Sequence, residues 1–471
     1  MNIYELVPET KKLISEDISL NSISINSKEI NKGDIFVSID GSIKNRKLYY
    51  KEVVLKGAKV ILTNLEINIE ASIPIIFIKD LKERLSNLSN DFYNCPSKKI
   101  EVFGITGTNG KSSVASYLHQ IMMLHGEKAG LISNFDNKES HYSKLTTPDV
   151  FLLNKIIKKC VEEKKQSIIF EVSSHAIHQK RVEGIEFDYG CLTSFSRDHL
   201  DYHGSINEYS KVKESFFEEN LFNNAVINTE SNLGKKIVRQ NKNFISLSSL
   251  DKNADIYLEI KKEISTIHSP WLKINLPKEI FAQHSMMNIA SSLGLFLAAS
   301  ETKKIKETNL KKLKGLPGRL ELVKLKFDQS CYIDYAHTPE ALKITLQSLR
   351  NKYAGALICI FGCGGERDNG KRSLMGEIAA SMADNIIITN DNPRLENPEK
   401  ISLEILKGIK DKSKTEVIYD RTIAIKTGLN KLKNKEKDSV LLIAGKGHES
   451  FQEISGKFIK SNDFDIIRSH N

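Results

Sequence analysis

The sequence predicts an α/β protein of three domains. Short apolar runs, typical of buried strands, alternate along most of the chain with longer segments that repeat apolar residues at helical spacing. Repeated strand–helix units of this kind form largely parallel sheets with helices on both faces. The chain has 471 residues, whereas domains usually contain about 100–200, so more than one hydrophobic core is expected.

The first two domains are expected at residues 1–95 and 96–315. In the first, the strand-like runs "DIFVSI" and "AKVILTN" alternate with polar turns and the amphipathic segment "YYKEVVLKGA". In the second, we expect strands at "IEVFGIT", "SIIFEVSS" and "FDYGCLTSF", with helical segments such as "KSSVASYLHQIMMLHG" between them. A β-rich segment is expected around residues 243–282.

The third domain, residues 316–471, follows a linker that contains Gly315, Pro317 and Gly318. The runs "SCYIDYA", "ALICIFG", "NIIITN", "EVIYD" and "DSVLLIAGKG" alternate with helical segments, which predicts a doubly wound, Rossmann-like sheet. Ligands of such sheets bind at the carboxyl ends of the strands. The loops "DYAHTPE", "GCGGERDNGKR", "DNPRLENP" and "GKGHES" all follow strands, so their placement favours a functional role.

Composition limits the classes of function. The net charge is +10, but Lys and Arg are interleaved with Asp and Glu, so no nucleic-acid partner is expected. The six cysteines form no C-x-x-C pair, which argues against a metal cluster. The N-terminus lacks an apolar signal core, and no apolar stretch approaches the roughly 18 residues of a membrane span. We therefore expect a cytoplasmic protein that inserts into no membrane.

The stretch "GITGTNGKSS", residues 104–113, predicts a phosphate-binding loop of the P-loop type in the central domain. Glycines let backbone N–H groups converge on phosphate oxygens, and a helix N-terminus adds a partial positive charge. Lys111 can reach terminal phosphates, and the Ser112 hydroxyl can bind magnesium. The general spacing G-x-x-x-x-G-K-[ST] requires glycine at position 105, where this chain has Ile105, so the context of strand, turn and helix carries the prediction.

"TGTNGKSS" is the form that this loop takes in the Mur ligases and their folylpolyglutamate synthetase relatives. "TTPD" at 146–149, "EVSSHAIHQKRV" at 171–182 and "SRDHLDYHG" at 196–204 follow in the order and spacing of that family, as do "DYAHTPEAL", "GCGGERDNGKR", "DNPR" and "GKGHE". Over essentially its whole length the chain resembles the Mur ligase family, and in particular the branch that adds the third residue of the peptidoglycan peptide. The resemblance implies that a substrate carboxylate takes the γ-phosphate of ATP and that an incoming amine displaces phosphate from the acyl phosphate.

The resemblance also implies residues for ATP and Mg²⁺. The ATP-binding set is Gly107, Thr108, Asn109, Gly110, Lys111, Ser112, Ser113, Asn288, Arg319, Asp334 and His337. The implied metal ligands are Ser112, Glu171, His199 and Lys213, the last as a carbamylated, anionic lysine. Lys111, Lys213 and His199 are the implied catalytic residues, and Lys371 and Arg372 are expected to approach phosphate on domain closure. The family's usual Phe-Asn-x-x-Asn reads "HSMMN" here, with His284 and Ser285 in place of its first two residues.

Two further sets are implied for the other substrates. The family positions that hold UDP-MurNAc-L-Ala-D-Glu are matched by Ser27, Thr146, Thr147, Ser173, Gln179 and Arg181. In the turn "DGSIKNRKLY", Ser42, Ile43 and Lys44 stand where the family often has a His-Gln pair. The amino-acid pocket is expected from Arg367, Asp391, Asn392, Arg394, Gly445 and Glu449, with Glu449 facing a distal ammonium.

Arg394 decides the expected amino acid. Its guanidinium suits a carboxylate, and meso-2,6-diaminopimelate has a distal carboxylate that lysine lacks. The resemblance therefore implies a ligase, expected to be a monomer, that adds meso-diaminopimelate. Two alternatives remain open from the residues: another carboxylate–amine ligase, such as a lysine-adding enzyme or a folylpolyglutamate synthetase, and a P-loop ATPase or nucleic-acid-binding switch.

Overall fold

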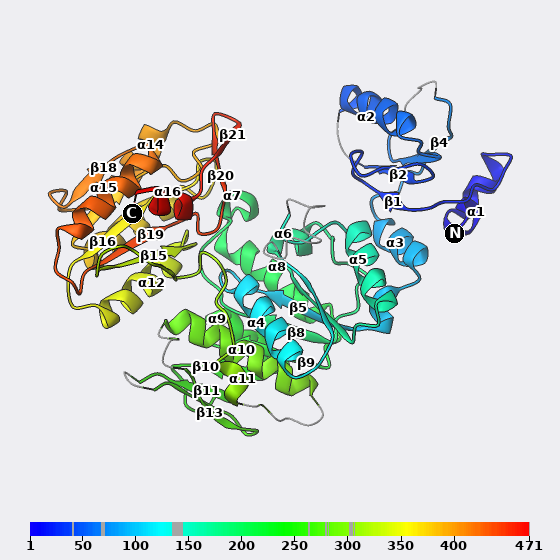
Figure 1. The fold of residues 1–471 in the computed structure, drawn as a ribbon. Helices are drawn as coiled ribbons and strands as arrows, with labels where there is room; N and C mark the ends of the chain where they lie inside the picture. Colours follow the sequence, from blue (N-terminus) through cyan, green and yellow to red (C-terminus); the bar gives the residue numbers. More distant parts are fainter. Residues whose placement is uncertain are drawn as a thin grey trace. The chain divides into compact units, whose positions relative to one another are not determined.

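The computed structural model describes residues 1–470 except 40–41, 67–70, 134–144, 262–263, 278–279, 281, 301–304 and 306. Figure 1 follows the chain from blue at the N-terminus to red at the C-terminus. Two compact units are distinguished by their internal contacts. The first unit comprises Met1–Thr106, Met122–Gly190 and Phe216–Asn223, and the second comprises Gly107–Ile121, Cys191–Ser215 and Asn224–Asn471.

The first unit begins with a small parallel sheet. Its four strands lie in the order β1 (Ile23–Ser24), β2 (Ile35–Ser38), β3 (Val60–Thr63) and β4 (Ile75–Phe77). Successive side chains of a strand point to opposite faces. Accordingly, Ile35 and Val37 join one buried cluster, while Phe36 joins the other, where it packs with Tyr50 and Val53. The strands predicted at "DIFVSI" and "AKVILTN" are confirmed.

Helices cover both faces of that sheet and continue into the rest of the first unit. They are α1 (Ile3–Leu6), η1 (Pro8–Lys12), α2 (Ile43–Leu55), α3 (Leu85–Tyr93), η2 (Pro96–Lys99), α5 (Val150–Glu162) and α6 (Ser174–His178). Three more parallel strands of this unit lie in the order β5 (Glu101–Thr106), β7 (Ser167–Glu171) and β6 (Ala129–Ile132). Asp149 starts α5 by accepting hydrogen bonds from the N–H groups of Phe151 and Leu152, an N-cap that satisfies otherwise unpaired donors.

The second unit contains two groups of strands. The first group has β9 (Asn224–Asn228), β10 (Ile245–Ser248) and β11 (Ile256–Glu259) in parallel, extended by the antiparallel strands β12 (Thr266–His268) and β13 (Lys273–Asn275). This confirms the β-rich segment expected around 243–282. After its first segment in this unit, Gly107–Ile121, the chain returns to the unit within β8 (Tyr189–Leu192). The associated helices are α4 (Lys111–Leu124), α7 (Leu200–His203), α8 (Ile206–Glu218), α9 (Asn232–Gln240), α10 (Gln283–Ala299) and α11 (Glu307–Leu310).

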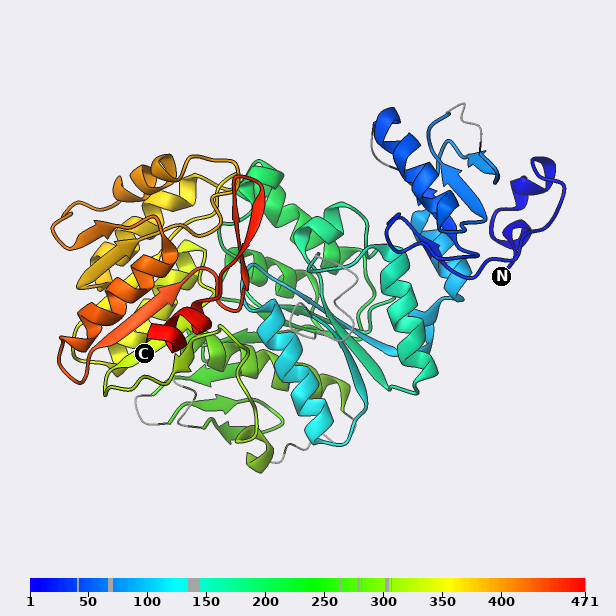
Figure 2. The same ribbon diagram turned by 45° about the horizontal axis from the view of Figure 1, so that its top comes forward.

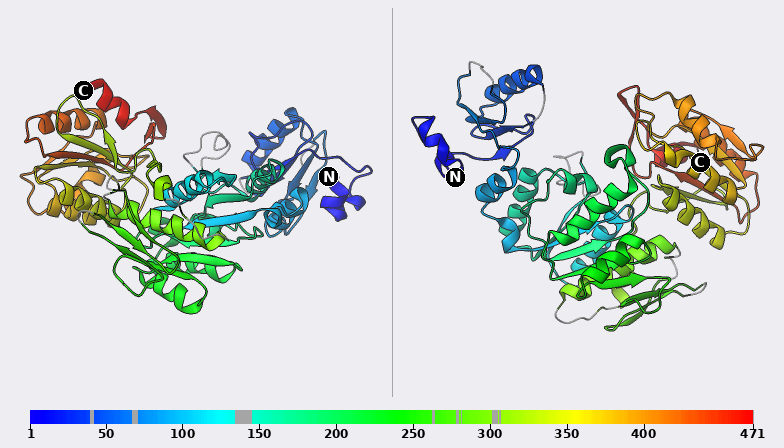
Figure 3. Two further views of the ribbon diagram at one scale, coloured as in Figure 1. Left: turned by 60° about the horizontal axis from the view of Figure 1, so that its bottom comes forward. Right: turned by 180° about the vertical axis from the view of Figure 1, so that it is seen from behind.

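The second group of strands forms the C-terminal sheet. Its order is β14 (Glu321–Val323), β15 (Ser330–Asp334), β19 (Val440–Ala444), β16 (Leu357–Phe361), β17 (Asn385–Ile388) and β18 (Thr415–Val417), and only β14 is antiparallel. A hairpin of β20 (Phe451–Ile454) and β21 (Lys457–Lys460) follows β19. Figures 2 and 3 show this yellow-to-red part of the chain from other sides.

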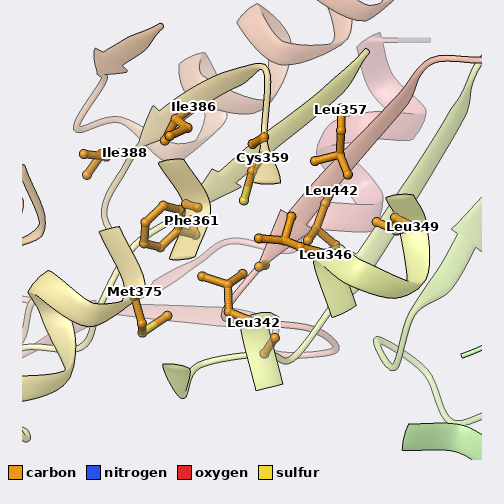
Figure 4. Close-up of a cluster of buried hydrophobic side chains, with 14 of the residues drawn as sticks. Leu342, Leu346, Leu349, Leu357, Cys359, Phe361, Met375, Ile386, Ile388 and Leu442 are labelled. Carbon is orange, nitrogen blue, oxygen red and sulfur yellow. The ribbon is translucent and has the colours of Figure 1, made fainter. Parts of the chain in front are cut away.

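Helices cover both faces of the C-terminal sheet, as a doubly wound fold requires. On one face lie α12 (Pro339–Lys352), α13 (Gly370–Met382) and α14 (Pro398–Leu406). Leu346 of α12 and Met375 of α13 belong to the same buried cluster as Phe361 of β16 (Figure 4). On the other face lie α15 (Arg421–Lys433) and α16 (Asp463–His470), which pack against Ile358 and Ile360. The predicted Rossmann-like arrangement is confirmed. Within the described part of the chain, no helix has the length and apolar character needed to cross a membrane.

Candidate active site

The glycine-rich loop needs its glycines for both backbone conformation and space. Gly107 and Gly110 have φ values of 145° and 91°. A Cβ atom on Gly107 would lie 2.0 Å from Thr193 Oγ1, and one on Gly110 would lie 2.5 Å from Asn288 Oδ1. Helix α4 begins directly after this turn, so the loop and the helix N-terminus together form the kind of surface that binds phosphate.

Two lysines converge on this loop. Lys111 Nζ donates to the carbonyl oxygens of Gly107 and Thr108, each at 2.9 Å, and Lys213 Nζ donates to the Gly107 oxygen at 3.1 Å. Lys213 is 1% exposed, and its burial, together with the charge of Lys111, holds its pKa well below the usual value. The neighbouring Lys211 is exposed and pairs with Glu208. Of the two lysines, the structure therefore places Lys213 at the loop.

Helix α8 supports Lys213 through Tyr209. The Tyr209 ring lies 5.1 Å from Lys213 Nζ, within the range of a cation–π contact. Its hydroxyl is 3.0 Å from Thr108 Oγ1, which links the helix to the phosphate-binding loop. Because positions 209 and 213 are four residues apart, they share one face of α8. This spacing explains why Lys213, rather than Lys211, reaches the site.

A buried carboxylate, Asp198, lies beside the predicted ligand His199. Its oxygens are 3.4 Å from His199 Nε2, 3.8 Å from His337 Nε2 and 3.6 Å from Lys371 Nζ. Burial alone would raise the pKa of Asp198, but its interaction with His337 and the charges of Lys371 and His199 hold that pKa well below its usual value. Asp198 is thus an anion at which the predicted residues His199, His337 and Lys371 meet.

A pocket with an interior volume of about 130 Å³ adjoins the loop inside the second unit. Six predicted nucleotide residues line it: Asn109, Gly110, Ser113, Asn288, Arg319 and Asp334. Arg319 stacks over the ring of Tyr335 at 4.3 Å. His284 also lines the pocket, and its burial lowers the pKa of its imidazole. Sequence reasoning missed Thr193, Glu230 and Tyr335 as lining residues, although each follows a strand end.

Asp334 has a structural task in addition to lining the pocket. Its carboxylate accepts hydrogen bonds from the N–H groups of Leu320, at 2.6 Å, and Ala336, at 2.8 Å. Leu320 has a φ of 45°, so this contact holds the linker in a conformation that a leucine rarely adopts. The "LPGRLE" linker and the end of β15 are therefore joined at the pocket.

The loops "DNPR" and "GKGHE" are in contact within the second unit. Glu449 accepts hydrogen bonds from Asn392 Nδ2 and Lys446 Nζ, both at 3.0 Å. Burial would raise the pKa of Glu449, but the charge of Lys446 and the bond from Asn392 lower it. Burial and the charge of Glu449 raise the pKa of Asp391. Gly445 is required beside Asp391, because a Cβ there would lie 2.5 Å from its Oδ2 atom.

Arg394 and Arg367, the two predicted pocket arginines, have different surroundings. Arg394 Nη1 donates to the Gly365 oxygen at 2.7 Å, and its Nε lies 3.4 Å from Glu453 Oε2. Arg367 Nη1 instead lies 3.5 Å from Asp201 Oδ2. The described contacts thus join Arg394 to the pocket loops, whereas Arg367 pairs with the segment that carries His199.

Arg372 does not have the role expected for it. Its side chain is fully buried and donates to Glu396 at 2.7 and 2.9 Å, to Glu404 at 2.8 Å and to the Gly364 oxygen at 3.1 Å. These bonds hold the loop after β16 and leave the guanidinium enclosed, so it is not positioned to reach a phosphate. Lys371, beside Asp198, faces the site instead.

The first unit brings together several residues predicted for the dipeptide substrate. Thr147 Oγ1 donates to the Glu171 carbonyl oxygen at 2.7 Å and accepts from Ser173 N at 3.0 Å. Arg181 Nη1 donates to the backbone carbonyl oxygen of Thr147. Glu171, at the end of β7, is 1% exposed and accepts a bond from Ser133 Oγ at 3.1 Å. Thr146 precedes this group, and Gln179 is the C-terminal cap of α6.

The residues predicted for the uridine lie in the turn after β1 and at the start of α2. Ser27 Oγ donates to Glu52 Oε2 at 2.9 Å, and Ser42 caps α2 through Asn45 N. The start of the predicted turn, Asp40 and Gly41, lies outside the described residues. Arg46, which sequence reasoning did not select, is buried and donates to the Ser38 oxygen and to Thr63 Oγ1. It therefore sits at the carboxyl ends of β2 and β3, where ligands of parallel sheets bind.

Comparisons with known proteins define the class. The family model for the Mur ligase middle domain matches residues 105–296, and that for the Mur ligase glutamate ligase domain matches residues 318–447. A relative in Coxiella burnetii, UDP-N-acetylmuramoyl-L-alanyl-D-glutamate–2,6-diaminopimelate ligase, is 32% identical over 98% of this chain and 97% of its own length. The chain therefore belongs to the Mur ligase family.

Solved structures agree with this assignment. A structure of UDP-N-acetylmuramoyl-L-alanyl-D-glutamate–2,6-diaminopimelate ligase matches with a TM-score of 0.64 and 25% identity, covering 100% of this chain and 98% of the other. The MurF ligase of Thermotoga maritima in complex with ADP matches with a TM-score of 0.69 and 16% identity, covering 97% and 98%. The second similarity concerns the fold alone.

Proposed function

We propose that this chain is an ATP-dependent amide ligase that adds meso-2,6-diaminopimelate to UDP-MurNAc-L-Ala-D-Glu during the synthesis of peptidoglycan precursors. The nearly full-length similarity to diaminopimelate ligases carries the proposal. The position of Arg394, whose guanidinium contacts the "GCGGERD" loop at Gly365, supports it, since this cation suits a second carboxylate. The proposed domains are residues 1–95 for the UDP-substrate, 96–315 for ATP and 316–471 for the amino acid.

The nucleotide is proposed to bind along the glycine-rich loop and the pocket beside it. Backbone N–H groups of the loop and Lys111 hold the phosphates, which are anionic acceptors. On the side of the glycine-rich loop, the nucleotide site also includes Thr108, Asn109, Ser113 and Asn288. On the opposite side, it includes Arg319, Asp334 and His337. This arrangement directs the γ-phosphate toward a carboxylate, which attacks it to give an acyl phosphate and ADP.

Mg²⁺ would be held by Ser112, Glu171, His199 and carbamylated Lys213. Three of these four donors fit Mg²⁺ well, because a hydroxyl, a carboxylate and a carbamate supply the oxygen ligands that it prefers, whereas His199 supplies a nitrogen. In the described residues, no group of three or more His, Cys, Asp and Glu side chains is arranged to hold a metal ion by itself. When bound, the ion would reduce the repulsion between the triphosphate and the substrate carboxylate.

The remaining residues are proposed to position the two other substrates. Thr146, Thr147, Ser173, Gln179 and Arg181 hold the acidic part of UDP-MurNAc-L-Ala-D-Glu, with Ser27 toward the uridine. Diaminopimelate binds among Arg367, Asp391, Asn392, Arg394, Gly445 and Glu449, so that its amine attacks the acyl phosphate and phosphate leaves. Holding the amine beside the acyl phosphate is itself a large part of the rate enhancement.

A single assay tests this function. The full chain is supplied with ATP, Mg²⁺ and UDP-MurNAc-L-Ala-D-Glu, together with either meso-diaminopimelate or lysine, and phosphate release and product mass are measured. Turnover is expected with diaminopimelate. Turnover with lysine alone would indicate a lysine-adding ligase, and ATP hydrolysis without dependence on any amine would indicate an ATPase. We also propose that the enzyme acts in the cytoplasm and that its oligomeric state is a monomer.

The Arg394→Gln variant tests the amino-acid site. Hydrogen bonds to charged groups contribute about 1.5–3 kcal/mol, so the KM for diaminopimelate is expected to rise by about 10–150-fold. The KM for ATP should stay within about twofold, because Arg394 does not line the nucleotide pocket. An unchanged KM for diaminopimelate would remove Arg394 from the site.

A further inference from the structure

The guanidinium of Arg394 already faces a carboxylate of this chain. Glu453 Oε2 lies 3.4 Å from Arg394 Nε, and the two side chains are 28% and 22% exposed. The distance is longer than that of a strong N–H···O bond, so the contact is a loose ion pair. Both side chains are accessible to a small ligand. Glu453 therefore occupies the kind of position that a ligand carboxylate would take on this arginine.

The guanidinium offers few edges for a carboxylate. It can bind one through two parallel hydrogen bonds either at Nε and Nη2 or at Nη1 and Nη2. Nη1 already donates to the Gly365 oxygen at 2.7 Å. The Nε edge is the one that Glu453 faces. A second carboxylate that binds this edge through two hydrogen bonds must move Glu453 aside.

The backbone of Glu453 is held independently of its side chain. Its N–H donates to Asn392 Oδ1 at 2.9 Å, and its carbonyl oxygen accepts from Arg394 N at 3.0 Å. Ser455 N donates to the Arg394 oxygen at 2.7 Å, and Gln452 Nε2 donates to the Asp391 oxygen at 2.6 Å. The hairpin of β20 and β21 thus holds the "DNPR" loop through backbone and amide contacts. Changing the Glu453 carboxylate leaves all of these bonds in place.

We propose that Glu453 tunes the affinity for the amino acid by acting as an internal carboxylate on Arg394 that the distal carboxylate of diaminopimelate displaces. This inference rests on the proposed function. An amino acid without a distal carboxylate cannot make the exchange and leaves the Glu453–Arg394 pair in place. Glu453, placed 59 positions after Arg394 in the sequence, thus sets the affinity of this arginine for diaminopimelate in the ligation.

The experiment compares the KM for meso-diaminopimelate in the wild type, Glu453→Gln and the control Glu436→Gln, at saturating ATP and UDP-MurNAc-L-Ala-D-Glu. Glu436 is exposed, and its change removes the same charge from the same domain. Because partly exposed ion pairs contribute modestly, removing the internal competitor is expected to lower the KM by about two- to fivefold. Glu436→Gln should leave it unchanged.

Two further variants make the result specific. Glu453→Asp shortens the side chain by one methylene, which moves the carboxylate away from Arg394, and should also lower the KM for diaminopimelate. This variant therefore provides a second test if Glu453→Gln folds poorly. In an Arg394→Gln background, Glu453→Gln should have no effect, because the exchange acts through Arg394. The same decrease in both backgrounds would contradict the proposal.

The remaining outcomes separate the inference from the proposed function. A KM that rises in Glu453→Gln would mean that the carboxylate binds the distal ammonium, and an unchanged KM would mean that it is inert; either result overturns the inference alone. Failure of the wild type to use diaminopimelate contradicts the proposed function and this inference with it.

Discussion

The buried ion pair between Arg421 and Asp463 allows a quantitative test of how the C-terminal domain is held together. Arg421 Nε and Nη2 donate to the two carboxylate oxygens of Asp463 at 2.8 and 2.7 Å, and the side chains are 1% and 0% exposed. Nη2 also donates to the Ala444 oxygen at 3.2 Å. The pair therefore joins the starts of α15 and α16 to the end of β19.

The change Arg421→Met leaves the Asp463 carboxylate buried without its partner. Breaking a buried pair in this way costs about 3–5 kcal/mol. With a urea m-value of about 2 kcal/mol/M, the unfolding midpoint of the domain should fall by about 1.5–2.5 M. The double change Arg421→Met/Asp463→Leu should recover most of the loss, because well-packed apolar groups replace buried ion pairs at little cost.

Hydrogen exchange of peptides from β19 and α16, followed by mass spectrometry in increasing urea, measures the free energy of opening of this domain. Tryptophan fluorescence would not report on it, since the only tryptophan is Trp271, beside β13. Lys437→Met is the control, because Lys437 and Asp328 form a pair that is 79% and 71% exposed and should contribute less than about 1 kcal/mol. Equal losses in Arg421→Met and Lys437→Met would refute the reasoning.

Three other outcomes are expected. Lys213→Ala should reduce turnover by at least about 10–100-fold, even with added bicarbonate, whereas Lys211→Ala should retain activity; near-normal turnover of Lys213→Ala removes that lysine from the site. Gly110→Ala should raise the KM for ATP by about 10–100-fold, because its Cβ would meet Asn288 Oδ1 at 2.5 Å. Gly126→Ala, with a similar φ of 90° and open space around it, should leave that KM unchanged, and equal effects would show that strain rather than contact is responsible. Arg372 lowers the pKa of Glu396 to about 2, so the stability contributed by Glu396 should be complete above about pH 4.5 and be lost as the pH falls toward 2; unfolding midpoints of Glu396→Gln should lack this part of the acid dependence.

The alternation of strands and helices was readable from the sequence because it is local. A strand such as "ALICIFG" is apolar along its whole length, since both faces of a doubly wound sheet are covered, and β16 is buried at every position. The phosphate-binding loop was readable for the same reason, because its glycines, lysine and helix start are consecutive. The residues that cause each of these elements to form are therefore close together in the sequence.

Arg372 shows where a motif by itself was insufficient. The family resemblance implied that Arg372 would approach phosphate on domain closure, but α13 turns its side chain toward Glu396 and Glu404. Those partners lie 24 and 32 residues away, so no local pattern indicates the pairing. Arg46 was missed for a similar reason, since its partners come from the ends of two separate strands.

The sequence by itself determined the α/β class, the phosphate-binding loop and the family, because each depends on residues close together or on motifs in a fixed order. Only the tertiary structure decided which charged side chains meet. It buried Lys213 beside Lys111, assembled His199, His337 and Lys371 around Asp198, and set Glu453 against Arg394. These contacts depend on burial and on the packing of segments that are distant in the sequence. A charged side chain interacts strongly with another only after folding has brought the two together and excluded water from between them.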